Sequence, residues 1–260
     1  MASEETAAGA EPVAQAHGPL FQFEVHPILP IRIGGLDLSF TNSSLFMVAA
    51  LVIVAVFLTA SVKSRALVPG RWQSMAEMAY EFVANMIRDN VGTEGRRYFP
   101  FIFTLFMFIL FGNLLGLLPY SFTFTSHIIV TGALALTVFI GVTLVGILRH
   151  GLHFFSFFVP AGVPAVMIPV MVPIEVISYL SRPVSLSIRL FANMMAGHTM
   201  LKVFAGFVVP LGAASFGIGG VAPIVMDVAL IAFELLVAFL QAYVFTVLTC
   251  LYLNDAIHLH

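Results

Sequence analysis

One strongly apolar stretch, residues 164–209, contains five side chains that carry or can carry a charge. They are Glu175, Arg182, Arg189, His198 and Lys202. A charge at the centre of a membrane helix costs about 2.5–3.5 kcal/mol even on lenient insertion scales, so it is retained mostly where it faces a partner, a cavity or an ion path. Arg189 has apolar neighbours on both sides, and its guanidinium is a permanent positive charge. We expect the function of the chain to centre on this residue.

On a helix, Arg189 would lie in the middle of a polar stripe. Each residue turns a helix by about 100°, so Glu175, Arg182 and Arg189, seven apart, lie within about 40° of one another. Ser185 and Asn193 stand four residues before and after Arg189, on the same side. A fixed cation in such a stripe attracts a carboxylate from another helix.

A second polar stripe is predicted near the end of the chain. Asp227, Glu234 and Gln241 are again seven apart. His198 follows Arg189 by nine residues and therefore lies about 180° round the helix from it, on the opposite face. The two stripes require two long helices to position them.

The segment between these helices, residues 210–223, is rich in Gly and Pro and predicts a turn. In an antiparallel hairpin about this turn, residue counting places Glu234 near His198 and Gln241 near Arg189. A histidine beside a carboxylate can pass protons through water near neutral pH. The arginine cannot carry protons in this way, so it would instead block direct proton leakage.

Simpler interpretations compete at several positions. We favour a cap or an interface contact over a relay for Asp227, and a helix–helix hydrogen bond for Asn113. For Arg182, an anchor or an inter-helix salt bridge remains as open as a functional role. A static pair between Arg189 and Glu175 is disfavoured, because fourteen residues span about 21 Å of helix.

Composition places the chain in the membrane. Of 260 residues, 60% are hydrophobic and 9% charged, and the mean hydropathy is +1.03. Cys250 is the single cysteine, which excludes an intrachain disulfide and a multi-cysteine metal site. No basic tract suggests a nucleic-acid partner, no GxxxxGK[ST] loop suggests a nucleotide, and no internal repeat suggests an inverted-repeat transporter. We therefore expect no cofactor and no metal.

The fold expected is an all-α integral membrane protein. Residues 1–40 form an acidic tail without the features of a signal peptide, followed by a pre-membrane segment, and residues 41–255 form a single membrane domain. The expected helices of that domain are one spanning helix (41–63), an amphipathic surface helix (69–92), a transmembrane hairpin (98–119 and 126–149), and two long tilted helices (165–209 and 223–253).

Two of these helices leave alternatives open. A helix over residues 165–209 would be about 65 Å long, twice the hydrocarbon thickness, so it either breaks into two crossings or lies bent and strongly tilted. We expect the bent, tilted form. The amphipathic helix could instead belong to a small soluble insert.

Basic residues predict the orientation. One side of the expected arrangement carries Arg32 alone, and the other carries Lys63, Arg65, Arg71, Arg88, Arg96, Arg97 and Arg149. Positive charge marks the cytoplasmic side. We therefore expect an external N-terminus and a cytoplasmic C-terminus.

Three motifs carry a family resemblance. They are PIEVISYLSRPVSLSIRLFANMMAGH, FELLVAFLQAYVFTVLTCLYL and FGNLLGLLP. With them, roughly residues 40–255 resemble subunit a of the F-type ATP synthase membrane sector. The resemblance implies a non-catalytic stator subunit beside a rotating c-ring (the subunit c oligomer), whose small hairpin subunits each hold a buried carboxylate. It also implies two offset proton half-channels, and as partners peripheral-stalk subunit b, other ATP synthase subunits and membrane lipid.

The resemblance also assigns roles. Arg189 resembles the arginine that meets the ring carboxylate, with Asn193 and Gln241 beside it. Channel-lining positions are matched by Glu175, His198 and Glu234; some family members carry the acid and the histidine of the last two in exchanged order. The implied location is a bacterial inner membrane, or else another energy-coupling membrane. A secondary transporter and a purely structural membrane anchor remain the alternative functions.

Overall fold

The computed structural model describes residues 23–30, 32–33, 36–37, 39–63, 69–118, 121–159, 167–215 and 217–258. Its helices are α1 (Asn42–Lys63), α2 (Arg71–Val91), α3 (Phe99–Gly116), α4 (Ile128–His150), α5 (Ile168–Ala214) and α6 (Val221–Ile257). Short 3-10 helices are η2 (Thr93–Tyr98), η3 (Phe124–Ser126), η4 (Gly151–Phe158) and η5 (Ile218–Gly220). The acidic tail expected over residues 1–20 and part of the Pro-rich connector, residues 160–166, lie outside the described residues.

Within the described ranges, five helical segments are long and apolar enough to cross a membrane. They comprise α1, η2 with α3, α4, α5, and η5 with α6. The expected all-α membrane fold is therefore confirmed.

The pre-membrane segment forms two small antiparallel ladders before the first helix. Strand β1 (Pro27–Leu29) pairs with β4 (Phe40–Thr41), and β2 (Arg32–Ile33) pairs with β3 (Leu36–Asp37). Helix α1 starts directly after β4, where the Thr41 hydroxyl accepts a 3.3 Å hydrogen bond from the Ser44 amide. This bond satisfies one of the free amides at the start of the helix.

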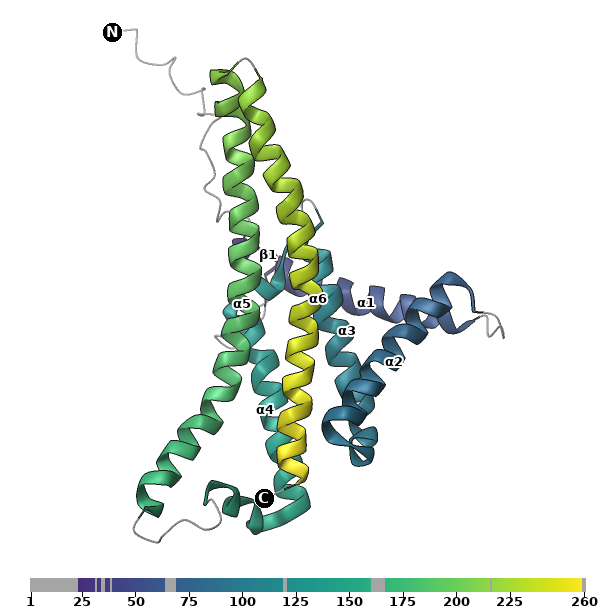
Figure 1. Ribbon diagram of the computed structural model, residues 1–260, viewed down its shortest axis with the longest axis vertical. Coiled ribbons are helices and arrows are strands. Elements are labelled where there is room, and N and C mark those ends of the chain that lie inside the picture. Colours follow the sequence, from purple (N-terminus) through teal and green to yellow (C-terminus); the bar gives the residue numbers. More distant parts are fainter. Residues whose placement is uncertain are drawn as a thin grey trace.

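Helix α5 is one continuous helix of 47 residues, although Pro173, Pro183 and Pro210 lie inside it. At about 1.5 Å per residue it is about 70 Å long. A proline removes one intrahelical hydrogen bond and crowds the preceding turn, which bends a helix. In Figure 1, α5 and α6 run side by side toward their joined end, and the first part of α5 bends away from α6. Helix α5 therefore continues through Pro183 and does not break there.

The two long helices meet at a tip that depends on glycine. A Cβ atom on Gly220 would lie 3.0 Å from the Val208 carbonyl oxygen and 3.4 Å from the Gly212 Cα. Gly217, at the turn, has a φ of 92°, which a side chain would strain. Close backbone approach therefore holds α5 and α6 together at this end.

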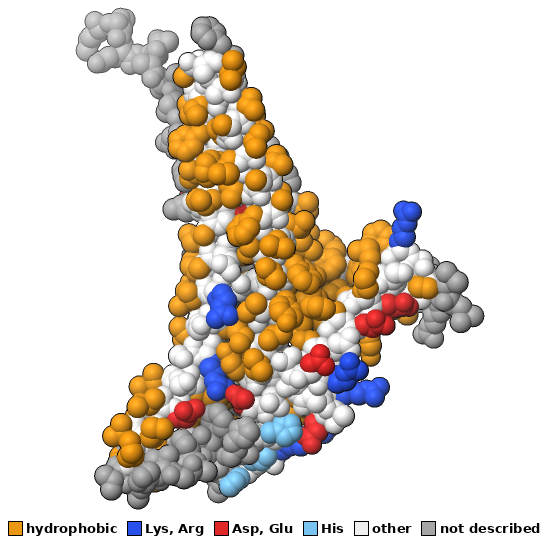
Figure 2. Space-filling model, viewed as in Figure 1, with side chains coloured by type: hydrophobic (Ala, Val, Ile, Leu, Met, Phe, Trp, Pro, Cys, Tyr) orange, Lys and Arg blue, Asp and Glu red, His pale blue; other side chains and the backbone are white. Residues whose placement is uncertain are grey.

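The buried core lies between α2, α3, α4, α5 and α6. Among its fully buried side chains are Phe106 of α3, Leu190 of α5 and Phe245 of α6. Helix α1 runs at a wide angle to the α5–α6 hairpin in Figure 1. Apolar side chains cover the visible face of that hairpin, as Figure 2 shows. On this face, the hairpin thus presents a largely apolar surface that the other described helices leave uncovered (Figure 2).

Candidate functional site

Arg189 lies on the exposed side of α5, near its middle. Its neighbours on that surface are apolar: Val184 is 57% exposed and Ile188 is 47% exposed. The guanidinium has no hydrogen bond and no ion pair with any residue that the structure describes. Ser185, one turn earlier, is exposed on the same side. The described part of the chain thus leaves a permanent charge unpaired on this surface.

One turn beyond Arg189, an amide pair joins the two long helices. The Asn193 side chain of α5 donates a 2.8 Å hydrogen bond to Oε1 of Gln241 in α6. Gln241 is buried, and its Nε2 has no partner among the described residues. The pair fixes α5 against α6 beside the arginine, and the free N–H group can donate to an acceptor there.

Two buried titratable side chains lie further along the hairpin, His198 on the face of α5 opposite Arg189 and Glu234 on α6. The His198 imidazole is buried, and its Nε2 lies 3.1 Å from the hydroxyl of Thr123, which directly precedes η3. The buried Glu234 carboxyl of α6 lies against Gly197, where a Cβ would come within 2.1 Å of Oε1. Its Oε2 has no partner among the described residues. The absence of a side chain at Gly197, the residue before His198, therefore leaves room for the Glu234 carboxyl.

A second polar group lies at the other end of the hairpin. Arg182 of α5 forms a 2.9 Å ion pair with Asp255 of α6. The guanidinium carbon lies 5.4 Å from the Tyr179 ring centre and 5.0 Å from that of Tyr252. This is an inter-helix salt bridge with cation–π support on both sides. Glu175, half-buried, lies two turns before Arg182 on the same helix.

Two other predicted residues, Asn113 and Asp227, lie outside these groups. Asn113 of α3 donates a 3.3 Å hydrogen bond to the Ala238 carbonyl oxygen of α6, which joins these two helices. Asp227 does not cap α6, because the helix begins at Val221 and its N-cap is Gly220. Its Oδ1 is buried without a partner among the described residues.

Sequence reasoning missed three of these groups. Thr123 gave no signal, because it lies in a short link between two apolar helices. Asp255 did give a sequence signal: it follows Gln241 by fourteen residues and so extends the stripe of α6 residues that are seven apart. A 3.3 Å contact between the hydroxyls of Thr131 and Ser187, which joins α4 to α5, was hidden by the apolar context of both residues.

The arrangement has a fixed cation between two polar groups. His198 lies nine residues, about 13 Å, to one side of Arg189, and Glu175 lies fourteen residues, about 21 Å, to the other. No cluster of three or more metal-binding side chains occurs in the described part of the chain. The two polar groups thus lie on opposite sides of Arg189 along the hairpin.

Comparison with known proteins gives one consistent result. Residues 43–254 match the family model described as "ATP synthase A chain". A relative from Mesorhizobium japonicum, named ATP synthase subunit a, is 62% identical over 242 residues, which cover 92% of this chain and 96% of the relative. A relative with the same name from Paramagnetospirillum magneticum is 58% identical over 93% of this chain and 99% of the relative. Another, from Rhodospirillum rubrum, is 57% identical over 94% of this chain and 100% of the relative.

Proposed function

The chain belongs to the ATP synthase A chain family, and from that premise we propose that it couples proton transfer to rotation of a c-ring. It is a membrane-embedded stator subunit that associates with other ATP synthase subunits. The c-ring and peripheral-stalk subunit b are its proposed neighbours. The observation that carries the proposal is the exposed, unpaired guanidinium of Arg189 on an apolar helix surface.

The ring packs on the apolar surface around Arg189. Exposed apolar side chains continue from Ile188, beside Arg189, to Val225 and Val228 of α6 near the tip of the hairpin; all three are at least 47% exposed, and such side chains suit a wall of apolar helices. A carboxylate on the ring that reaches this surface meets the guanidinium and is favoured in its ionised form. Arg189 thereby empties the ring site of its proton and keeps the two half-channels apart.

One half-channel passes the buried pair of α5 and α6. His198, Glu234 and Thr123 supply an imidazole, a carboxyl and a hydroxyl, which water can link into a proton path. A proton delivered here neutralises a ring carboxylate, which can then enter the lipid. Protonation neutralises the carboxylate and so removes most of the free-energy cost of moving it into the hydrocarbon.

The other half-channel starts near Glu175. After almost a full turn of the ring, the carboxyl group returns on the far side of Arg189 and releases its proton there. The Arg182–Asp255 ion pair holds α5 to α6 at this end. A membrane potential of 100 mV supplies about 2.3 kcal/mol per proton, so several protons are combined for each product molecule.

The setting proposed is a bacterial inner membrane, with the N-terminus outside and the C-terminus in the cytoplasm. The charge pattern of the connecting segments supports this orientation. Helix α1, 22 residues or about 33 Å long, matches one bilayer crossing. Because α5 and α6 run at a wide angle to α1 in Figure 1, they lie strongly tilted in the membrane, along the ring.

The test is proton pumping by the reconstituted complex with Arg189→Ala or Arg189→Lys. We expect both variants to assemble and to lose coupled pumping, because alanine removes the charge and lysine lacks the planar guanidinium. Lys202→Ala is the matched control, since it removes an exposed cation from the same helix. A structural anchor would tolerate Arg189→Ala, and pumping at the normal rate would refute the proposal. A secondary transporter would instead move a solute without the ring.

A further inference from the structure

A second site lies away from the proton path, between the C-terminal half of α2, η2 and the start of α3. It is a cavity of about 580 Å³, a volume common for small-molecule sites. Its wall combines hydrogen-bond donors with aromatic rings. They include Asn85, Arg88, Thr93, Arg96, Tyr80 and Phe99. None of the described residues that line it is acidic.

The charges around this cavity leave it positive. Arg96 has no ion pair with the described residues, and Arg88 meets only its sequence neighbour Asp89, at 3.8 Å with both side chains about 70% exposed. Such an exposed pair contributes little. Glu94, the acid of η2, is instead bound by Arg149 of α4. Two guanidinium groups beside the cavity are therefore available to an anion.

The position of the cavity sets its depth in the membrane. Phe99 and Pro100, which line it, are the first residues of α3, so the cavity lies where a spanning helix leaves the hydrocarbon. Phospholipid phosphates occupy this level of a bilayer. Helix α2 is amphipathic and exposes Met75 and Met78, as a helix at the membrane surface does.

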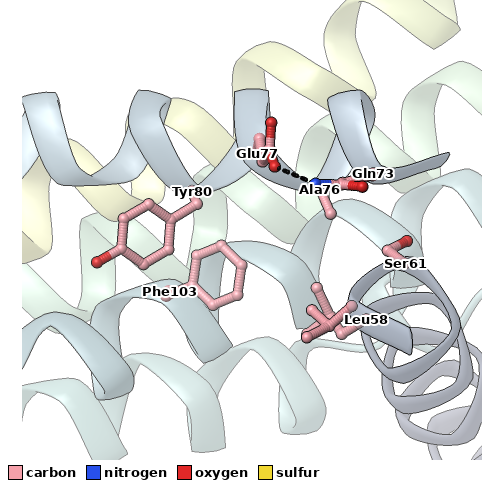
Figure 3. Close-up of a pocket in the computed structure, with 8 residues that line it drawn as sticks. Leu58, Ser61, Gln73, Ala76, Glu77, Tyr80 and Phe103 are labelled. Carbon is pink, nitrogen blue, oxygen red and sulfur yellow. Dashed lines mark hydrogen bonds between the residues drawn. The ribbon is translucent and has the colours of Figure 1, made fainter. Parts of the chain in front are cut away.

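An apolar cavity adjoins the first one and shares Tyr80 with it. This second cavity, of about 400 Å³, lies between α1, α2 and α3, and most of its lining is apolar, including Leu58, Val62 and Phe103. Its polar lining includes Gln73, which donates a 2.8 Å hydrogen bond to Glu77. Figure 3 shows Tyr80 and Phe103 side by side on its wall, with Leu58 of α1 beyond them. The rings of Tyr80 and Phe99, 4.6 Å apart, line the boundary between the two spaces. An acyl chain fits here beside a charged headgroup.

We propose that these two neighbouring cavities bind an anionic phospholipid. Arg88 and Arg96 contact its phosphate, Asn85 and Thr93 donate hydrogen bonds to it, and an acyl chain runs past Tyr80 into the apolar cavity. The site steadies α2 against α1 and α3 without contributing to proton transfer.

The experiment uses the assembled complex and phosphatidylglycerol with a photoactivatable group in its acyl chain, followed by peptide mapping. We expect labelling of the segments that contain Tyr80 and Phe103. Combined Arg88→Gln and Arg96→Gln substitution should reduce labelling about thirtyfold at limiting lipid, since each basic residue at a membrane surface contributes about a factor of five. The matched control is Arg97→Gln, which removes an exposed charge that does not line the cavity.

Several outcomes overturn the proposal. Labelling by a phosphatidylcholine probe that equals labelling by phosphatidylglycerol would remove the role of charge, and this comparison uses the unaltered protein. Loss of labelling on addition of excess inorganic phosphate would assign the cavity to a soluble anion. A photoreactive amino acid in place of Asn85 should capture lipid, and capture of a protein subunit would show that a partner fills this site.

Discussion

Gly197→Ala tests whether the position of the Glu234 carboxyl matters for proton transfer. The new methyl group would lie 2.1 Å from Oε1 and 3.0 Å from the carboxyl carbon, whereas ordinary contact begins at 3.4 Å. The oxygen must therefore move by about 1.3 Å. Because the carboxyl is the end of a flexible side chain, and alanine favours a helix over glycine by up to about 1 kcal/mol, the fold should survive.

We expect proton pumping to fall about tenfold to a hundredfold, since a displacement of about 1 Å in a reacting group has effects of this size. The assay is ATP-driven acidification of vesicles that contain the complex, with the amount of assembled complex measured in parallel. Gly206→Ala, on the same helix with no atom within 4 Å of its Cβ, is the control for the change in helix propensity. Glu234→Gln shows the effect of removing the acid. Normal pumping by Gly197→Ala beside an inactive Glu234→Gln would refute the argument from position.

Two further changes test the packing that holds the site. Arg182→Met leaves Asp255 without this ion-pair partner and should lower the free energy of unfolding by about 1–3 kcal/mol, measured as a lower thermal midpoint of the complex. Exchanging the two residues, so that position 182 carries the acid and position 255 the base, should restore part of the lost stability. A double variant as unstable as Arg182→Met would contradict the pairing. Gly112→Ala places a methyl group 2.5 Å from the fully buried ring of Phe124 and should cost about 1–3 kcal/mol. Gly141→Ala, with no atom within 4 Å, is its control, and equal losses from both would contradict the clash.

Helix periodicity and length carried most of the fold prediction. Hydrophobic runs of about twenty residues predicted a membrane protein, and seven-residue spacing predicted which polar side chains share a face. The effect of Pro183 could not be read from the sequence, because a proline either ends a helix or bends it according to what packs around it. In the structure α5 passes through Pro183 and bends.

Residue counting about the turn gave neighbours to within about one helical turn. The Glu234 carboxyl lies against Gly197, the residue before His198, and Gln241 bonds Asn193, one turn from Arg189. The contact of His198 with Thr123 was beyond such counting, because 75 residues separate the two and the packing of the hairpins decides their approach. The spacing of residues along one helix therefore predicts which side chains share a face of that helix. Contacts between segments far apart in the sequence follow only from the tertiary structure.

The exposed arginine of α5, Arg189, also bears on assembly of the complex. Before a neighbour arrives, Arg189 faces lipid with nothing to offset its charge, and that state carries a penalty of about 2.5–3.5 kcal/mol or more. If the proposed ring docks here, its carboxylate relieves this penalty, so the side chain that meets the rotor also favours assembly of the complex. On this proposal, a subunit without that neighbour is less stable in the membrane than a subunit in the assembled complex.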